Sequence, residues 1–163
     1  MATTALGGTP VHTVGDLPVP GSTAPAFTLV GSDFSEVTLE AGTRTVLNIF
    51  PSVDTPVCAA SVKKFNELAA GLDNARVVCV SADLPFAQAR FCGAQGLDDV
   101  VAASAFRSSF GDDYGVRLVD GGFAGLFARA IVVVDTDGSV TYAELVPEIG
   151  QEPDYDAVIA ALG

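Results

Sequence analysis

Two stretches of the chain are apolar at most positions, and each has the length of a single strand. They cover residues 45–50 and 77–80. A short apolar run of about 4–8 residues, bounded by turn formers, is typical of a strand that is buried on both faces of a sheet. The pattern therefore predicts two central strands, the first of which ends at Pro51.

A helix signal follows the first strand. Asp54 and Thr55 are candidate caps, Pro56 suits the first helical position, and Gly71 suits the end. We therefore predict a helix over residues 56–70. Its apolar positions fall on one helical face, at Val62, Phe65, Leu68 and Ala69.

A second helix follows the second strand. Pro85 suits its first turn and Gly93 its end, so residues 86–92 are predicted to be helical. A short apolar segment over residues 100–103 predicts a further strand. The mixed stretch that runs to Tyr114 has room for one short helix.

The C-terminal part carries the clearest pair of strands. Residues 126–134 are mostly apolar, the turn 135–138 ends in Asp-Gly, and residues 139–146 follow, which together predict a β-hairpin. A final helix is predicted from about residue 153 onward, because apolar residues recur there at helical spacing. These residues are Tyr155, Val158, Ile159 and Leu162.

The order of these elements predicts the fold class. The first half reads as a βαβ unit and the second as a ββα unit, separated by a central insertion. Such units combine into an α/β fold with a mixed central sheet and helices on both faces, the thioredoxin-like arrangement. Residues 1–26 are rich in Gly, Pro and Thr, which predicts a turn-rich N-terminal extension with a hairpin. No linker divides the chain, so we expect a single domain over residues 1–163, with this extension packed on it.

Composition and charge exclude several classes of protein. Of the 163 residues, 49% are hydrophobic and 17% are charged, which fits a chain with a full core and excludes a disordered tail. A net charge of −12 repels nucleic acid and anionic lipid, and no apolar run is long enough to span a membrane. The first basic residue is Arg44, so no secretory or transit signal is predicted and a cytoplasmic location is expected.

Three cysteines carry the candidate chemistry: Cys58, Cys79 and Cys92. In a reducing compartment each is either an inert core residue or a reactive thiol. Cys79 lies inside an apolar strand, which predicts an inert core residue. The single histidine, His12, lies in the extension and is predicted to be an ordinary surface or turn residue.

Cys58 occupies the third position of the first predicted helix. The unpaired N–H groups at a helix start favour negative charge, and the thiolate is the reactive form of cysteine. A helix terminus contributes at most about 2 kcal/mol, which is less than a thiol needs to be largely ionised at neutral pH. A cation is therefore required nearby.

Arg129 is the best candidate for that cation. If the strand over 126–134 runs antiparallel to the first strand, Arg129 near its start lies at the same sheet edge as Cys58. An unpaired guanidinium among its apolar neighbours would also be unfavourable. The predicted topology places four other basic residues away from this edge, Arg44, Lys63, Lys64 and Arg76. The sequence does not place three further arginines, Arg90, Arg107 and Arg117.

The segment before the first helix carries a family resemblance. The pattern Pro51-x-x-x-Thr55-x-x-Cys58 resembles the peroxidatic-cysteine signature of peroxiredoxins. The longer runs 50–66, 79–93 and 128–135 are similar to the bacterial thiol peroxidases, an atypical two-cysteine branch of that family.

The resemblance implies a role for each matching residue. Cys58 would attack the peroxide bond of hydrogen peroxide or an organic hydroperoxide and become a sulfenic acid. Thr55 would hydrogen-bond the thiolate and the peroxide, Pro51 would shield the site from water, and Arg129 would stabilise both. Cys92 would resolve the sulfenic acid as an intramolecular disulfide, which thioredoxin reduces. The resemblance further implies a homodimer that needs no metal or organic cofactor.

The pairing of Cys58 with Cys92 makes a geometric demand. A disulfide needs Cα atoms within about 7 Å, whereas packed helices have axes about 8–10 Å apart. At least one helix end must therefore unwind in each cycle. From the residues alone, a cysteine near a helix end such as Cys92 is equally typical of a structural residue.

Four other functions compete with peroxide reduction. A thioredoxin-type exchange protein uses Cys-x-x-Cys, but Cys58 is followed by Ala59, Ala60 and Ser61. A cysteine hydrolase needs a histidine base near the thiol, and a zinc module needs ligands in close pairs; the sequence offers neither. The remaining alternative is a non-enzymatic redox sensor or interaction domain on the same fold.

Overall fold

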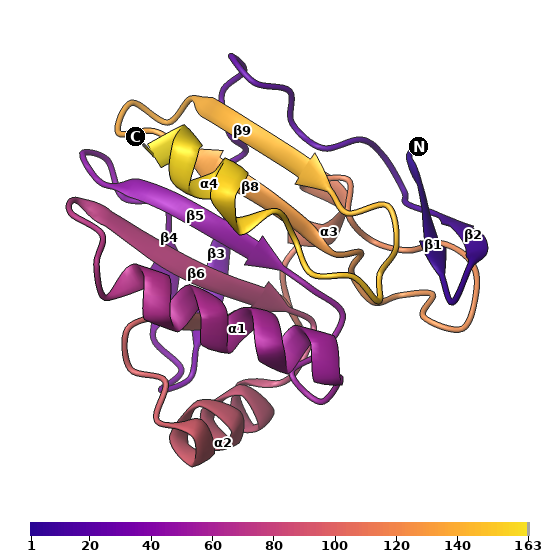
Figure 1. The fold of residues 1–163 in the computed structure, drawn as a ribbon, viewed down its shortest axis with the longest axis horizontal. Coiled ribbons are helices and arrows are strands. Elements are labelled where there is room, and N and C mark those ends of the chain that lie inside the picture. The colour runs from indigo at the N-terminus through magenta and orange to yellow at the C-terminus, as the bar shows by residue number, and fades with distance from the viewer. Residues whose placement is uncertain (163) are drawn as a thin grey trace.

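A seven-stranded mixed sheet forms the centre of the computed structural model, which describes residues 1–162 (Figure 1). Its strand order is β4-β3-β7-β6-β5-β8-β9. A separate two-stranded sheet contains β1 and β2. The strands are β1 Thr3–Leu6, β2 Thr9–His12, β3 Thr28–Gly31, β4 Glu36–Thr38, β5 Arg44–Ile49, β6 Ala75–Ser81, β7 Val101–Ser104, β8 Ala130–Val134 and β9 Val140–Leu145. The helices are α1 Pro56–Ala69, α2 Pro85–Gln95, α3 Phe110–Asp113 and α4 Tyr155–Leu162.

The two predicted apolar strands lie at the centre of the sheet, which confirms that part of the sequence analysis. β5 runs parallel to β6 and antiparallel to β8, with Ile49 opposite Ala130. The end of β5, the end of β6 and the start of β8 therefore meet at one edge of the sheet. This register is what brings residue 129 to the segment that leads into α1.

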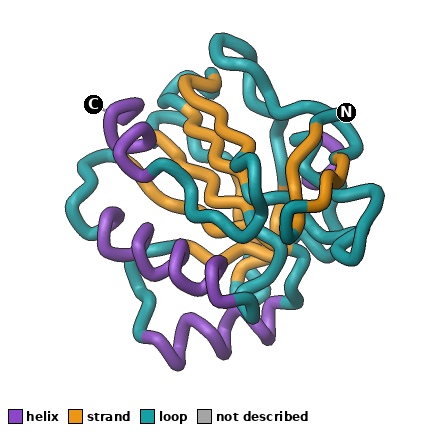
Figure 2. The backbone as a smooth tube through the Cα atoms, turned by 45° about the vertical axis from the view of Figure 1, so that its right-hand side comes forward, coloured by secondary structure: helices purple, strands orange, loops and turns teal. Residues whose placement is uncertain are grey.

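Helices cover both faces of the sheet, as predicted for the fold class. α1 and α4 lie on one face (Figures 1 and 2). Val62 and Phe65 of α1 and Val158 of α4 pack there in a buried cluster. The opposite face is covered by α3 and by the segment that follows the N-terminal hairpin of β1 and β2. The rings of Phe110 and Tyr114 stack there, with centroids 4.4 Å apart. Among the described residues, no helix is long and apolar enough to cross a membrane.

Two predicted boundaries were wrong, and one apolar position of the last predicted helix is exposed. α2 does not close at Gly93 but continues to Gln95 and ends at Gly96, whose φ of 64° allows the left-handed cap that Gly93 was expected to provide. β8 begins at Ala130 and not at residue 126, because residues 126–128 pair with the segment 116–118 instead. The predicted apolar position Ile159 is exposed, because the short α4 buries only Val158.

The predicted N-terminal hairpin is present as the antiparallel pair of β1 and β2, which lies beyond the ends of β5 and β9 (Figure 1). The carboxylate of Glu148 accepts hydrogen bonds from the N–H groups of Gly7 and Gly8, at 2.9 and 3.0 Å. The N–H of Ile149 donates to the carbonyl of Ala5 at 2.8 Å. His12 is a surface residue in β2. The loop 146–150 therefore holds the hairpin in place.

The extension also packs tightly against the loop after α3, and we expect the whole chain to unfold as one domain. Gly115 has a φ of 69°, and a Cβ there would lie 2.3 Å from the carbonyl oxygen of Asp16. Gly115→Ala should lower the free energy of unfolding by about 2–4 kcal/mol. Alanine is strained at this positive φ, and its Cβ would clash with the backbone of Asp16. Chemical denaturation followed by circular dichroism measures this free energy.

Gly122→Ala is the matched control, because a Cβ at that position meets no atom within 4 Å. Its free energy of unfolding should stay within about 0.5 kcal/mol of the wild type. An unchanged midpoint for Gly115→Ala, or a separate transition for residues 1–26, would contradict a single domain.

Candidate active site

The loop after β5 leads directly into α1 and places Cys58 one turn inside the helix start. Thr55 is the N-cap with extended backbone angles, and Pro56 is the first helical residue, as the sequence analysis expected. The Thr55 hydroxyl donates to the carbonyl oxygen of Ser52 at 3.1 Å and caps no N–H of the helix. The first N–H groups of α1 are thus left without a side-chain cap near the fully buried Cys58.

Arg129 lies immediately before β8 and points its guanidinium at that sulfur. Its Nη2 donates to Cys58 Sγ at 3.0 Å, and its Nε donates to the carbonyl oxygen of Ile149 at 2.8 Å. The side chain is only 1% exposed, and in the described residues no carboxylate forms an ion pair with it. A buried cation needs a negative partner, so this arrangement favours a negatively charged sulfur.

A pocket of about 280 Å³ opens beside this pair. Thr55 and Arg129 are its only polar or charged side chains, and Pro51 forms part of the wall, so the structure brings these three predicted residues together. Arg129 Nη1 is buried and has no hydrogen-bond partner among the described residues, which leaves a donor for a bound ligand. The full lining is Leu6, Pro51, Thr55, Pro56, Val57, Phe123, Arg129, Ile149 and Gly150.

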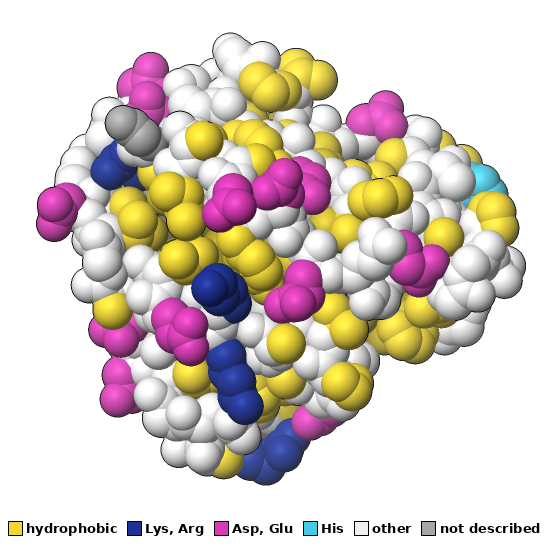
Figure 3. Space-filling model, in the orientation of Figure 1, with side chains coloured by type: hydrophobic (Ala, Val, Ile, Leu, Met, Phe, Trp, Pro, Cys, Tyr) yellow, Lys and Arg dark blue, Asp and Glu magenta, His cyan; other side chains and the backbone are white. Residues whose placement is uncertain are grey.

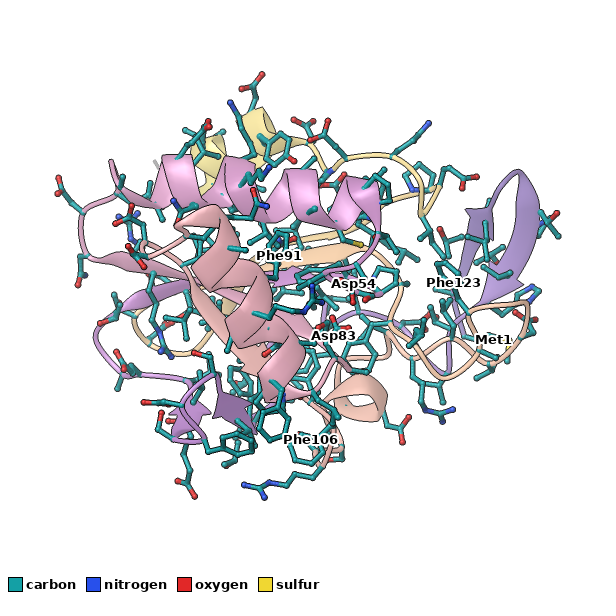
Figure 4. The ribbon with its side chains drawn as sticks, turned by 90° about the horizontal axis from the view of Figure 1, so that it is seen from below. Met1, Asp54, Asp83, Phe91, Phe106 and Phe123 are labelled. Atoms are coloured by element: carbon teal, nitrogen blue, oxygen red, sulfur yellow. The ribbon has the colours of Figure 1, made fainter. Side chains whose placement is uncertain are left out.

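Sequence reasoning missed the outer wall of the pocket. Leu6 comes from the N-terminal hairpin and Ile149 from the loop after β9. Phe123 comes from the loop before β8 (Figure 4). None of these positions stands out in a periodic pattern, because only the tertiary fold brings the three segments together.

The other two cysteines differ in their surroundings. Cys79 in β6 is buried, and burial raises its pKa to about 12. Cys92 on α2 is half-buried at the edge of the cluster that contains Cys58; burial first, and then the charge of Asp98, raises its pKa. All three are free thiols, so no disulfide joins Cys58 to Cys92 in this structure.

Asp83 is a further residue that the sequence analysis did not identify. It follows β6, and its carboxylate accepts hydrogen bonds from the Ser52 hydroxyl at 2.7 Å, the Val53 N–H at 2.9 Å and the Ser81 hydroxyl at 2.6 Å. These bonds hold the loop before α1 against the end of β6. The only sequence signal is an acidic residue directly after a buried strand.

The described residues offer no metal site: no three His, Cys, Asp or Glu side chains gather at one point.

Comparison with known proteins gives a consistent result. Residues 19–159 match the protein family described as Redoxin. The chain is 60% identical to the thiol peroxidases of Mycobacterium tuberculosis and Mycobacterium bovis, over 100% of this chain and 99% of each relative. A peroxiredoxin-like protein from Aquifex aeolicus superimposes with a TM-score of 0.95 at 41% identity, covering 99% of this chain and 96% of that one. The thiol peroxidase from Chromobacterium violaceum shares the fold, with a TM-score of 0.90 at 23% identity and coverage of 98% and 94%.

The burial of Cys79 predicts that this thiol does not react in the folded protein. A pKa of about 12 leaves roughly one thiolate in ten thousand at pH 8. Iodoacetamide at pH 8 should therefore label Cys79 only after denaturation, whereas the half-buried Cys92 should react in the native state. Peptide mapping by mass spectrometry measures both, and native labelling of Cys79 at the rate of Cys92 would show that β6 opens.

Proposed function

We propose that this chain, which belongs to the redoxin family, is a thiol-dependent peroxidase with Cys58 as its nucleophile. The observation that carries the proposal is the 3.0 Å contact between the buried Arg129 guanidinium and Cys58 Sγ. Both hydrogen peroxide and organic hydroperoxides contain the O–O bond that a thiolate attacks.

Several residues around the pocket take part in the first step of the proposed reaction. The Cys58 thiolate attacks one peroxide oxygen, the O–O bond breaks, and the leaving oxygen takes up a proton to become water or an alcohol. Arg129 stabilises the thiolate, and its unpaired Nη1 is the donor for the peroxide. Thr55 offers a hydroxyl to the same pocket, and Pro51 helps to exclude water.

Cys92 then resolves the sulfenic acid in the proposed cycle. Its thiol displaces hydroxide from the sulfenic sulfur, water leaves, and a Cys58–Cys92 disulfide remains. Thioredoxin returns both thiols by disulfide exchange, so that the protein needs no metal or organic cofactor. Because Cys58 lies buried in α1 and Cys92 on α2, part of one helix must unwind before the sulfurs meet.

We further propose a cytoplasmic homodimer. The free thiols suit a reducing compartment in which thioredoxin operates. Phe34 and Phe86 are 46% and 70% exposed with ring centroids 5.1 Å apart, and Leu84, two residues before Phe86, is 52% exposed. An exposed apolar patch of this kind favours association. Sedimentation at micromolar concentration should give twice the chain mass, and a monomer would contradict the dimer.

A redox sensor on the same fold is the alternative, and turnover distinguishes it from a peroxidase. With thioredoxin, its reductase and NADPH, a peroxidase consumes many equivalents of hydroperoxide, whereas a sensor consumes one. The names of the relatives at 60% identity favour the peroxidase.

Cysteine variants test the two proposed thiols. Cys58→Ser should abolish hydroperoxide consumption, because the nucleophile is gone. Cys92→Ala should consume one equivalent and stop, with Cys58 found as sulfenic or more highly oxidised sulfur by intact mass. Cys79→Ala serves as the control and should turn over like the wild type. Continued cycling by Cys92→Ala would move the resolving role to another thiol.

Arg129→Met tests the proposed electrostatic contribution. Loss of a charged hydrogen bond worth about 1.5–3 kcal/mol should lower kcat/KM for hydroperoxide about 10- to 150-fold. Lys63→Met removes the same charge from an exposed position of α1 and should change kcat/KM little. Equal losses in both variants would indicate a general effect of net charge.

A further inference from the structure

An exposed ion pair links the loop before α1 to helix α2. Arg90 on α2 directs its Nη2 at Asp54 Oδ1, 2.8 Å away. Arg90 lies two residues before Cys92, and Asp54 lies four residues before Cys58. Figure 4 shows Asp54 next to α2, the helix that carries Phe91. The pair thus joins the two segments that carry the proposed redox cysteines.

Apart from the contact between the Phe86 and Phe34 rings in its first turn, few other interactions hold helix α2. Its buried side chains are Pro85, Gln88 and Phe91, all in the first seven of its eleven residues. The Gln88 amide donates to Ser81 and Ala103, but its Oε1 is buried without a hydrogen-bond partner among the described residues. The helix has no side-chain N-cap, no acidic residue in its first turn and no basic residue in its last.

The half of α2 around Cys92 is the weakest part. Gly93 lies inside the helix, where it favours unwinding, and residues 93–96 are exposed. Cys92 itself is only half-buried, and burial raises its pKa, so less of this thiol is ionised here than in open solvent. The ion pair of Arg90 with Asp54 therefore adds to the few contacts that hold this half of the helix.

We propose that Arg90 is a positioning residue for the disulfide-forming step. The ion pair of Arg90 with Asp54 holds α2 against the loop before α1 while peroxide reacts. This ion pair must break before Cys92 reaches Cys58. The inference rests on the proposed function, because it requires Cys92 to be the resolving cysteine.

The sulfenic acid has two fates, and their ratio reports on this ion pair. In one, Cys58–SOH and the Cys92 thiol give the disulfide and water. In the other, Cys58–SOH and a second hydroperoxide give the sulfinic acid, Cys58–SO₂H, and water or an alcohol. The longer α2 stays in place, the longer the sulfenic acid is exposed to peroxide and the more sulfinic acid forms.

Arg90→Met keeps the length of the side chain and removes its charge. Intact mass and peptide mapping after graded excesses of hydroperoxide, without thioredoxin, give the ratio of sulfinic acid to disulfide. At low salt we expect this ratio to fall about two- to fivefold in the variant, the range that an exposed ion pair supports. Raising the salt to about 1 M should bring the wild-type ratio to that of the variant, which should not respond, because salt screens exposed charges.

Two further variants separate the ion pair from general effects. Arg90→Lys keeps the charge and should restore most of the wild-type ratio. Arg117→Met breaks another exposed ion pair, with Asp112 at 2.6 Å, and should leave the ratio unchanged.

An unchanged ratio in Arg90→Met, or an equal change in Arg117→Met, would overturn the role of Arg90 and leave the proposed peroxidase intact. If the wild type forms no Cys58–Cys92 disulfide at all, the resolving step fails, and the role of Arg90 fails with it. Peptide mapping of the wild type distinguishes these two results.

Discussion

The contact between a buried guanidinium and a cysteine sulfur is the interaction on which this structure depends. Arg129 is 1% exposed and contacts Cys58 Sγ and a carbonyl oxygen, but no carboxylate among the described residues. Removing such a charge from water is unfavourable unless an opposite charge compensates it. In the proposed mechanism the Cys58 thiolate supplies that opposite charge, and the reactivity proposed for the site follows from this contact.

The central sheet fixes the positions of the two residues in the contact between Arg129 and Cys58. β5 and β8 are antiparallel with Ile49 opposite Ala130, so the residue before β8 and the loop after β5 lie at one sheet edge. Asp83 after β6 then fixes the loop through Ser52 and Val53, and Ile149 orients the guanidinium through its carbonyl. Each of these groups comes from a rigid strand end or from a loop that is hydrogen-bonded at both sides.

Helix α2 contrasts with this rigid edge. Its N-terminal half is anchored by buried side chains, while the part around Cys92 is exposed and interrupted by Gly93. The proposed cycle, which binds peroxide in one conformation and forms a disulfide in another, needs one rigid component and one marginal component. The proposed nucleophile Cys58 belongs to the rigid part, and the proposed resolving thiol Cys92 to the marginal part.

The sequence alone determined the central strands, α1, the hairpin of β8 and β9, and the pattern Pro51, Thr55 and Cys58, because each depends on local periodicity or on turn and cap residues. It also indicated Arg129, since an arginine among apolar residues requires a partner. Gly93 and Gly96 are both possible helix ends by composition, and only the left-handed backbone at Gly96 decided between them. Leu6, Asp83, Phe123 and the pairing of Arg90 with Asp54 required the tertiary structure, because these contacts join segments that have no common pattern along the chain.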